Sequence, residues 1–126
     1  MQLAKKIARY ASQKKAEDIV ILDMREIVNF CDYFVICSGD ASRHLHAIAD
    51  GVIDGLAEEG QEIRYKEGLE KSSQSYAGSP TSDVVGAWAI LDLGDVVVHI
   101  FDPASREFYA LDHLWQDAAK VTWKRK

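Results

Sequence analysis

Cysteine is scarce in this chain of 126 residues, and long hydrophobic runs are absent. The two cysteines, Cys31 and Cys37, are too few for a disulfide scaffold or for a zinc site built from cysteines. The longest apolar runs fall far below the ~18 residues that a membrane-spanning helix requires, and nothing resembles a secretory signal. The length allows one ordinary hydrophobic core and not two. These features predict a single soluble, cytoplasmic domain in a reducing compartment, with no membrane partner.

Acidic residues are missing from both ends of the chain, and basic residues are scarce between the ends. Residues 1–15 carry five lysines or arginines and residues 120–126 carry four, with no acid in either segment. Residues 17–119 hold all 20 acids against six basic residues, so this central part has a formal charge of −14 while the ends sum to +9. An acidic body repels phosphate backbones, which argues against nucleic acid as the main ligand and for a basic protein partner. The alternative is that the charges only keep the domain soluble.

Hydrophobic spacing in the first half of the chain predicts two helices and two strands. Apolar residues at helical spacing predict an amphipathic helix over residues 3–15. Its basic composition also suits the start of an organellar transit peptide, but the segment is short and poor in serine, so we take it as the first helix of the domain. Runs of β-branched and aromatic residues predict strands at 19–24 and 33–38. Ser42 can then cap a second helix, for which Gly60 supplies the stop.

The second half of the chain predicts a hairpin between an irregular segment and a third helix. Residues 62–66 are a weak strand candidate, and residues 69–86 are rich in serine without usable periodicity, so we expect a loop insertion there. Residues 88–101 indicate two strands joined by a tight turn. The third helix should begin at Asp102-Pro103, with the basic tail at its C-terminal end. This order predicts a mixed five-stranded sheet packed with about three helices, in one α/β domain over residues 1–126.

Three polar side chains stand out in the predicted hairpin, whose other residues are almost all aliphatic or aromatic. They are Asp92, Asp95 and His99. A polar group beside a buried strand costs free energy unless it finds a partner, so these residues are either satisfied within the fold or part of a surface that another molecule completes. With about three helices for five strands, one face of the sheet should be covered incompletely. We expect the side that carries His99 to be the exposed one.

The turn of the hairpin leaves two registers open. A two-residue loop of Leu93 and Gly94 would pair Trp88 with His99 and leave an all-aliphatic core face. A three-residue loop ending in Gly94 suits turn preferences better, because leucine tolerates a positive φ poorly, and it moves Trp88 to the aliphatic side of the hairpin. A slip of one residue exchanges the two faces of a strand, so the register decides the role of Trp88.

No combination of residues indicates a catalytic or metal-binding centre. His44 and His46 are two positions apart on the predicted helix, about 200° around its axis, so they cannot chelate one metal ion. His99 and His113 have no ligand pair at a useful spacing. Ser38-Gly39-Asp40 lacks the lysine and the glycine spacing of a phosphate-binding loop, and it is not a nucleophile elbow. We therefore expect no enzyme activity, no metal and no cofactor.

A metal-dependent nucleotidyltransferase is the enzymatic alternative that the predicted architecture leaves open. A mixed sheet in which a Gly-Ser-like turn opens a helix is similar to that fold. Its chemistry needs paired carboxylates on adjacent strand positions, which hold two metal ions about 4 Å apart. No Asp-x-Asp or Asp-x-Glu falls in a predicted strand, and Asp92 and Asp95 flank a turn. The carboxylate pair that such an enzyme needs is therefore missing.

Several motifs in a fixed order resemble the Iojap-like ribosomal silencing factor family. They are Asp32-Tyr33-Phe34-Val35-Ile36, Ser42-Arg43-His44, Ala47-Ile48-Ala49-Asp50, the hairpin from Trp88 to Phe101, and the stretch with Arg106, Tyr109, Leu111, Leu114 and Trp115. The resemblance runs from about residue 16 to residue 117, with one large gap at 69–86. Each motif alone is a weak indicator, whereas the set in this order and spacing is specific.

The resemblance implies a steric blocker and not a catalyst. Members of this family bind the fourteenth protein of the large ribosomal subunit and obstruct joining with the small subunit, which lowers translation when nutrients are short. The resemblance also implies a fold similar to the nucleotidyltransferases without their catalytic carboxylates. It leaves open whether the free protein forms a homodimer.

Carried over position by position, the resemblance implies a docking surface in the hairpin and in the motif after it. The implied docking residues are Trp88, Leu91, Asp92, Asp95, His99, Phe101, Arg106, Tyr109, Leu114 and Trp115. For Phe101, Leu114 and Trp115 the alternative is a place in the core, because such residues at regular spacing usually pack inward. Asp92 and Asp95 could instead serve only the turn. The chain departs from the family at 69–86, where members commonly have a short connection. It also departs at Leu93, where many members have an aromatic residue, so we expect a weaker contact at this position in this chain.

Overall fold

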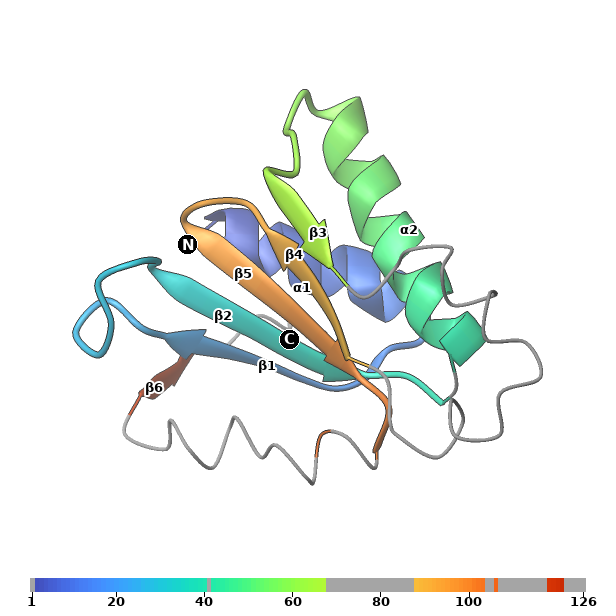
Figure 1. Cartoon of the computed structure of the whole chain (residues 1–126), viewed down its shortest axis with the longest axis horizontal. Coiled ribbons are helices and arrows are strands. Elements are labelled where there is room, and N and C mark those ends of the chain that lie inside the picture. The colour runs from blue at the N-terminus through green and yellow to red at the C-terminus, as the bar shows by residue number, and fades with distance from the viewer. Residues whose placement is uncertain (1, 41, 68–87, 104–105, 107–117, 122–126) are drawn as a thin grey trace.

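The computed structural model describes residues 2–40, 42–67, 88–103, 106 and 118–121. They form one mixed α/β domain, in which six strands make a single sheet and two helices pack against it (Figure 1). The elements are α1 (Gln2–Gln13), β1 (Glu17–Asp23), β2 (Tyr33–Ser38), α2 (Ser42–Glu58), β3 (Tyr65–Glu67), β4 (Trp88–Asp92), β5 (Val96–Phe101) and β6 (Ala119–Val121). No helix in these residues is long and apolar enough to cross a membrane.

The strand order in the sheet is β3-β4-β5-β2-β1-β6. Among the described strands, β2 and β5 are parallel neighbours, and the other neighbouring pairs are antiparallel. The chain leaves β2 through α2 and β3 and returns in the β4–β5 hairpin, so β5 comes to lie beside β2 in the same direction. The hairpin therefore occupies the middle of the sheet, next to the strand that precedes α2.

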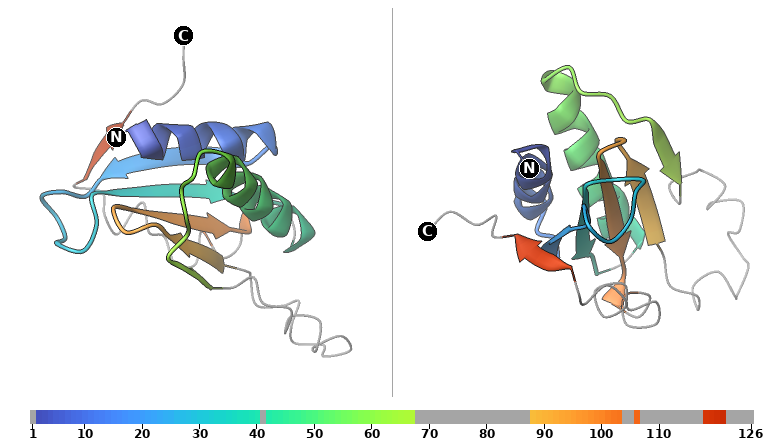
Figure 2. Two further views of the ribbon diagram at one scale, coloured as in Figure 1. Left: turned by 90° about the horizontal axis from the view of Figure 1, so that it is seen from above. Right: turned by 90° about the vertical axis from the view of Figure 1, so that its left-hand side faces the viewer.

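Both helices cover the same face of the sheet (Figure 2). Gly60 follows α2 with a φ of 80°, and the backbone N–H of Gln61 donates to the carbonyl oxygen of Leu56 at 2.9 Å. A glycine in the left-handed region with this hydrogen bond is a Schellman cap, so the predicted stop at Gly60 is confirmed. Gly55 lets α1 approach α2 closely, because a Cβ atom there would lie 2.7 Å from the ring of Tyr10.

Aliphatic side chains fill the space between the helices and the sheet. They come from both helices and from the four central strands, and each is at most 2% exposed. The largest of them are Ile7, Ile21, Val35, Leu45, Ile48, Val52, Leu56, Leu91, Val98 and Ile100. This layer is the main hydrophobic core.

The opposite face of the sheet carries a second, smaller cluster, which we call the aromatic face. Its buried members are Leu22, Met24, Cys31, Phe34, Ile36, Phe101 and Ala118, and the half-buried side chains of Val20, Val28, Trp88 and Val97 pack against them. Met24 and Cys31 belong to the β1–β2 loop, and Ala118 directly precedes β6. Segments distant in the sequence therefore bury this face.

The structure corrects the predicted number of strands. Six strands are described where five were predicted, because residues 119–121 pair with β1 as β6 instead of ending the third helix. A segment of three residues is too short for its sequence pattern to predict a strand. This strand forms by pairing with the edge of β1. β3 lies at 65–67, later than the predicted 62–66. The predicted 69–86 insertion and nearly all of the third helix lie outside the described residues, although Pro103 and Arg106 are helical.

Candidate protein-docking surface

The β4–β5 hairpin closes with a two-residue loop of Gly94 and Asp95. The N–H of Leu93 donates to the carbonyl oxygen of Val96 at 2.9 Å, and Gly94 has a φ of 95°. Glycine with a positive φ at the first loop position is what a type II′ turn requires. Both predicted loops are therefore wrong, and the actual loop lies one residue beyond the predicted Leu93-Gly94 loop. This position keeps Leu93 out of the positive-φ region, which a leucine tolerates poorly.

The observed register places Trp88 on the aromatic face together with His99. Trp88 pairs with Phe101, and Ile90 pairs with His99. The two faces are those of the predicted two-residue loop, although the pairing partners differ by two positions. The all-aliphatic core face is confirmed, and the placement of Trp88 on that face by a three-residue loop is wrong.

The two aspartates of the turn differ in what their side chains do. Asp92 is half-buried, and its Oδ1 accepts the N–H of Gly94 at 2.8 Å. Asp95 has an exposed side chain, while its carbonyl oxygen accepts the N–H groups of Asp32 at 2.7 Å and Tyr33 at 3.1 Å. Asp92 thus stabilises the turn, and Asp95 holds the turn against β2 through its backbone alone.

Three carboxylates, which we call the acidic tip, gather at this end of the sheet. They belong to Asp32, Asp92 and Asp95, around the buried thiol of Cys31. Burial first, and then the negative charges of the three carboxylates, raise the pKa of Cys31 to about 11. Among the described residues, none of the three is in an ion pair. The acidic tip therefore forms no ion pair among the described residues, although the guanidinium of Arg64 is near, since its Nη1 lies 3.0 Å from where a Cβ atom of Gly94 would be.

His99 is buried on the aromatic face, with 7% of its surface exposed. The indole Nε1–H of Trp88 donates to its Nδ1 at 3.2 Å, so the proton of the neutral ring lies on Nε2. Burial lowers the pKa of His99 to about 4. Nε2 has no hydrogen-bond partner in the described part of the chain. The prediction that the His99 side of the sheet is exposed is wrong at His99, because the second cluster covers it.

Aromatic rings surround His99. The ring of Phe34 meets it edge-on at a centroid distance of 4.6 Å, and the ring of Phe101 lies nearly parallel to it at 6.3 Å. Trp88 lies 5.0 Å from Phe101 and is half-buried. Phe101 is 0% exposed, which confirms the alternative that it belongs to the core. Trp88 is the aromatic residue of this hairpin that reaches the surface.

The remaining predicted docking residues are buried, bound to other strands or outside the described residues. Leu91 is 0% exposed and packs under the helices. The guanidinium of Arg106 donates to the carbonyl oxygen of Asp18 at 2.6 Å and to the hydroxyl of Ser38 at 2.9 Å, so it joins the start of β1 to the end of β2. Tyr109, Leu114 and Trp115 lie outside the described residues.

Two half-buried residues beside Trp88 and Asp92 were not predicted as surface residues. Ile90 and Val97 lie on the same face of the hairpin, and with Trp88 and Asp92 they form a half-exposed band that we call the hairpin strip. Strict alternation along β4 could have indicated Ile90, once Trp88 was placed. Tyr65, which is 55% exposed and pairs with Asp92, extends the strip onto β3.

Titratable groups elsewhere in the described residues serve the fold. His44 accepts the N–H of Asp40 at Nδ1 (2.9 Å), and its Nε2 lies 2.8 Å from the carbonyl oxygen of Lys14, which ties the β2–α2 turn to the end of α1. Burial raises the pKa of Cys37 to about 12, so its thiol is unreactive at neutral pH. Within the described ranges, no group of three histidines, cysteines or carboxylates could hold a metal ion.

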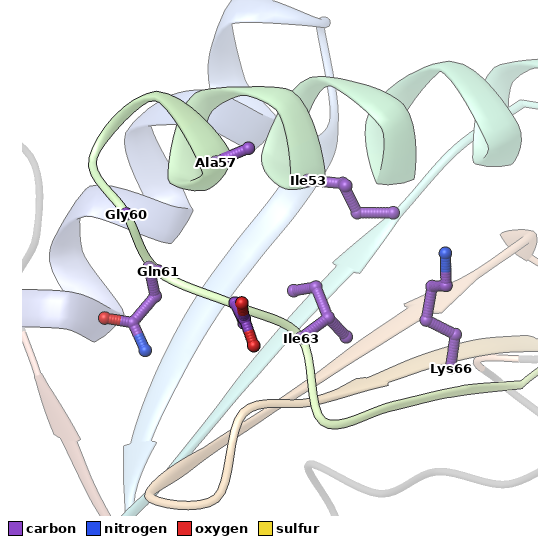
Figure 3. A pocket seen from close by; sticks show the side chains of 7 residues that line it. Ile53, Ala57, Gly60, Gln61, Ile63 and Lys66 are labelled. Carbon is purple, nitrogen blue, oxygen red and sulfur yellow. The ribbon is translucent and has the colours of Figure 1, made fainter.

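A cavity of about 440 Å³ lies on the helix side of the sheet, between the end of α2 and β3. Ile53, Ala57, Ile63 and Lys66 contribute to its wall, and Figure 3 shows the side chains of Ile53 and Lys66 reaching toward each other across it. None of the predicted docking residues lines this cavity, and it contains no histidine, cysteine or serine.

The fold and the hairpin together define a class of protein. It is a small mixed α/β domain in which three carboxylates gather at one end of the sheet, away from the cavity beside α2. A family model described as "Ribosomal silencing factor during starvation" matches residues 1–126, and the chain belongs to this family.

Relatives from distant organisms support this membership. The chain is 39% identical over 114 residues to the ribosomal silencing factor RsfS of Bacillus subtilis, which covers 90% of this chain and 85% of that protein. It is 33% identical over 103 residues to the mouse mitochondrial assembly of ribosomal large subunit protein 1, covering 82% of this chain and 40% of that protein. A crystal structure of a protein from Chromobacterium violaceum is similar with a TM-score of 0.75 and 29% identity, covering 100% of this chain and 93% of that one.

Proposed function

We propose that this protein binds the large ribosomal subunit through its fourteenth protein and sterically blocks joining with the small subunit, which represses translation when nutrients are short. Family membership supports a ribosomal role. The mouse relative is named for the assembly of the ribosomal large subunit. We expect the protein to act in the cytoplasm, as its bacterial relatives suggest.

The observation that carries the proposal is the acidic tip. Asp32 and Asp95 are exposed, Asp92 is half-exposed, and none of them forms an ion pair with a described cation. Such a surface attracts a basic protein and repels RNA phosphates, so a ribosomal protein is favoured over ribosomal RNA as the direct contact. The hairpin strip adjoins the acidic tip and adds apolar area from Trp88 and Ile90.

The proposed contact set follows from exposure. Trp88, Asp92 and Asp95 have surface that a partner can reach, whereas Leu91, His99 and Phe101 would act from beneath by holding the strip in shape. Arg106 would act in the same indirect way through its contacts with β1 and β2. Tyr109, Leu114 and Trp115 remain proposed contacts on the strength of the family resemblance alone.

Co-sedimentation with isolated large subunits tests the proposal. The wild-type protein should sediment with large subunits at micromolar concentration and moderate salt, and it should reduce the formation of joined ribosomes. The double variant Asp92→Lys/Asp95→Lys should bind about tenfold or more weakly, because reversed charges repel a basic surface. A wild-type protein that stays at the top of the gradient would refute the proposal.

A matched variant separates the effect of the acidic tip on binding from the effect of the protein's net charge. Asp54→Lys/Glu58→Lys makes the same change in charge at exposed positions of α2, which covers the other face of the sheet. This variant should bind large subunits as the wild type does. Equal binding by both double variants and the wild type would remove the acidic tip from the interface.

We expect no catalytic activity. The nucleotidyltransferase alternative needs two metal-binding carboxylates, yet Asp92 already accepts the N–H of Gly94 and Asp95 lies in the turn. Calorimetry with magnesium and each nucleoside triphosphate tests this expectation. Heat from metal-dependent nucleotide binding would reinstate the transferase.

A further inference from the structure

Two large apolar side chains outside the hairpin are exposed in the loop between β1 and β2. Phe30 is 62% exposed and Ile27 is 37% exposed. The loop projects from the same end of the sheet as the β4–β5 turn (Figures 1 and 2). Scattered exposed apolar residues are normal on protein surfaces, but two within four residues of one short loop form a patch that calls for an explanation.

Hydrogen bonds hold this loop in one shape. The N–H of Met24 donates to the carbonyl oxygen of Asp32 at 2.8 Å across the base of the loop, and the N–H of Ile27 donates to the carbonyl oxygen of Met24 at 3.0 Å. Val28 packs inward against the aromatic face. The loop thus presents Ile27 and Phe30 outward from a fixed backbone, which lowers the entropy cost of binding through them.

The exposed pair is continuous with the proposed docking surface. The ring of Phe30 lies 6.3 Å from that of Phe34, whose ring in turn contacts His99. Asp32, two residues after Phe30, donates its N–H to Asp95 in the hairpin turn at 2.7 Å. The apolar pair and the acidic tip therefore belong to one surface at one end of the sheet.

The charges around the pair are predominantly negative. The one cation of the loop, Arg25, is engaged by the carboxylate of Asp23 at 2.7 Å and lies over the ring of Tyr33. Asp32 and Asp95 are in no ion pair among the described residues. An open depression of about 490 Å³, lined by residues 25–30, adjoins the pair.

We infer that Phe30 and Ile27 are a second anchor of the docking surface, and that they insert into an apolar recess bordered by basic side chains on a protein partner. This inference rests on the proposed function and extends it from the hairpin to the β1–β2 loop. Nucleic acid is a poor occupant because its phosphates would face Asp32 and Asp95. A second copy of this chain is disfavoured, since a symmetric contact would bring two acidic tips together.

Substitutions in the loop test the second anchor by large-subunit co-sedimentation. Phe30→Ser should weaken binding by roughly tenfold to thirtyfold, the range for losing a buried aromatic at an interface. Phe30→Leu keeps an apolar side chain and should retain most of the affinity. Asn29→Ala changes an exposed polar neighbour in the same loop and should bind within about twofold of the wild type. All three variants should melt within a few degrees of the wild type, because the altered side chains are largely exposed.

The outcomes separate this inference from the proposed function. If wild-type protein sediments with large subunits, Asp92→Lys/Asp95→Lys does not, and Phe30→Ser binds like the wild type, the second anchor is refuted and the proposed function stands. If the wild type does not sediment, both fail. If Phe30→Ser converts a wild-type dimer to a monomer in sedimentation velocity and leaves subunit binding unchanged, the occupant is a second copy, and the inference is overturned.

Discussion

The two faces of the β4–β5 hairpin are built from different chemistry. On one face, Leu91, Val98 and Ile100 meet aliphatic side chains of α1 and α2, with no polar side chain among them. On the other, Trp88 and His99 share a hydrogen bond among aromatic rings, and one ring nitrogen has no partner in the described residues. The helix-covered face is complete in itself, whereas the aromatic face ends in the half-exposed hairpin strip.

The difference between the two faces separates residues that stabilise the fold from residues that need another explanation. A fold gains nothing from burying an imidazole whose N–H is unsatisfied, since this costs about 1–3 kcal/mol that an apolar residue would avoid. Among the described residues, no side chain of the helix-covered face carries this cost. A residue like His99 is therefore the place to look for a role beyond stability, here the holding of Trp88 at the edge of the strip.

The largest expected loss of stability comes from cavities made in the two faces of the hairpin. Ile100→Ala should destabilise the fold by about 2–5 kcal/mol, and Phe101→Ala by about 3–5 kcal/mol, because both side chains are 0% exposed and the cavities they leave cannot collapse fully. Urea unfolding of both variants measures the losses. A loss below about 1 kcal/mol for Phe101→Ala would show that the aromatic face is not a true core.

Acid should destabilise the aromatic face through His99. Its pKa of about 4 in the folded state is below the unfolded value of about 6.5, so the unfolded chain takes up the proton first as the pH falls. The free energy of unfolding therefore has its full value with respect to His99 above about pH 6.5. It falls by about 3 kcal/mol as the pH is lowered from about 6.5 to about 4.

The variant His99→Phe isolates this effect from the other titrating groups. Its stability should fall less between pH 7 and pH 4 than that of the wild type, by about the same 3 kcal/mol. Chemical denaturation at several pH values gives both curves. Parallel curves would mean that His99 is charged in the folded state or already accessible to solvent.

A smaller effect should follow from removing the indole donor. Trp88→Phe keeps an aromatic ring but leaves Nδ1 of His99 without its donor, which should cost about 1–2 kcal/mol. Imidazole ¹⁵N chemical shifts should show the proton on Nε2 in the wild type and a mixture of tautomers in the variant. Identical spectra would show that the Trp88 hydrogen bond does not select the tautomer.

The smallest effect on stability is expected at the acidic tip, at the end of the hairpin. Asp92→Asn/Asp95→Asn keeps an oxygen that can accept the N–H of Gly94, so the free energy of unfolding should change by about 0.5 kcal/mol or less. Binding to large subunits should nevertheless weaken. A large loss of stability would assign both aspartates to the fold and not to docking.

Local patterns in the sequence predicted much of the helix-covered layer. The helical spacing of apolar residues, the stop at Gly60 and the alternation in β5 each depend on neighbours within a few positions, and each is confirmed. The aliphatic face of the hairpin followed from the same alternation. The implied docking residues fared differently, because exposure depends on what packs from elsewhere: Leu91 and Phe101 are fully buried, and Asp95 is exposed.

The sequence by itself determined the family, the α/β class and the periodic core, because these depend on residue identity and short-range spacing. Only the tertiary structure decided the turn at Gly94-Asp95, the sixth strand and the burial of His99. The turn was selected by cross-strand pairing that keeps Leu93 out of the left-handed region, and β6 formed because β1 had an open edge. His99 is buried among the rings of Phe34, Trp88 and Phe101. Phe34 comes from a strand distant in the sequence, and a contact of that kind leaves no periodic trace in the chain.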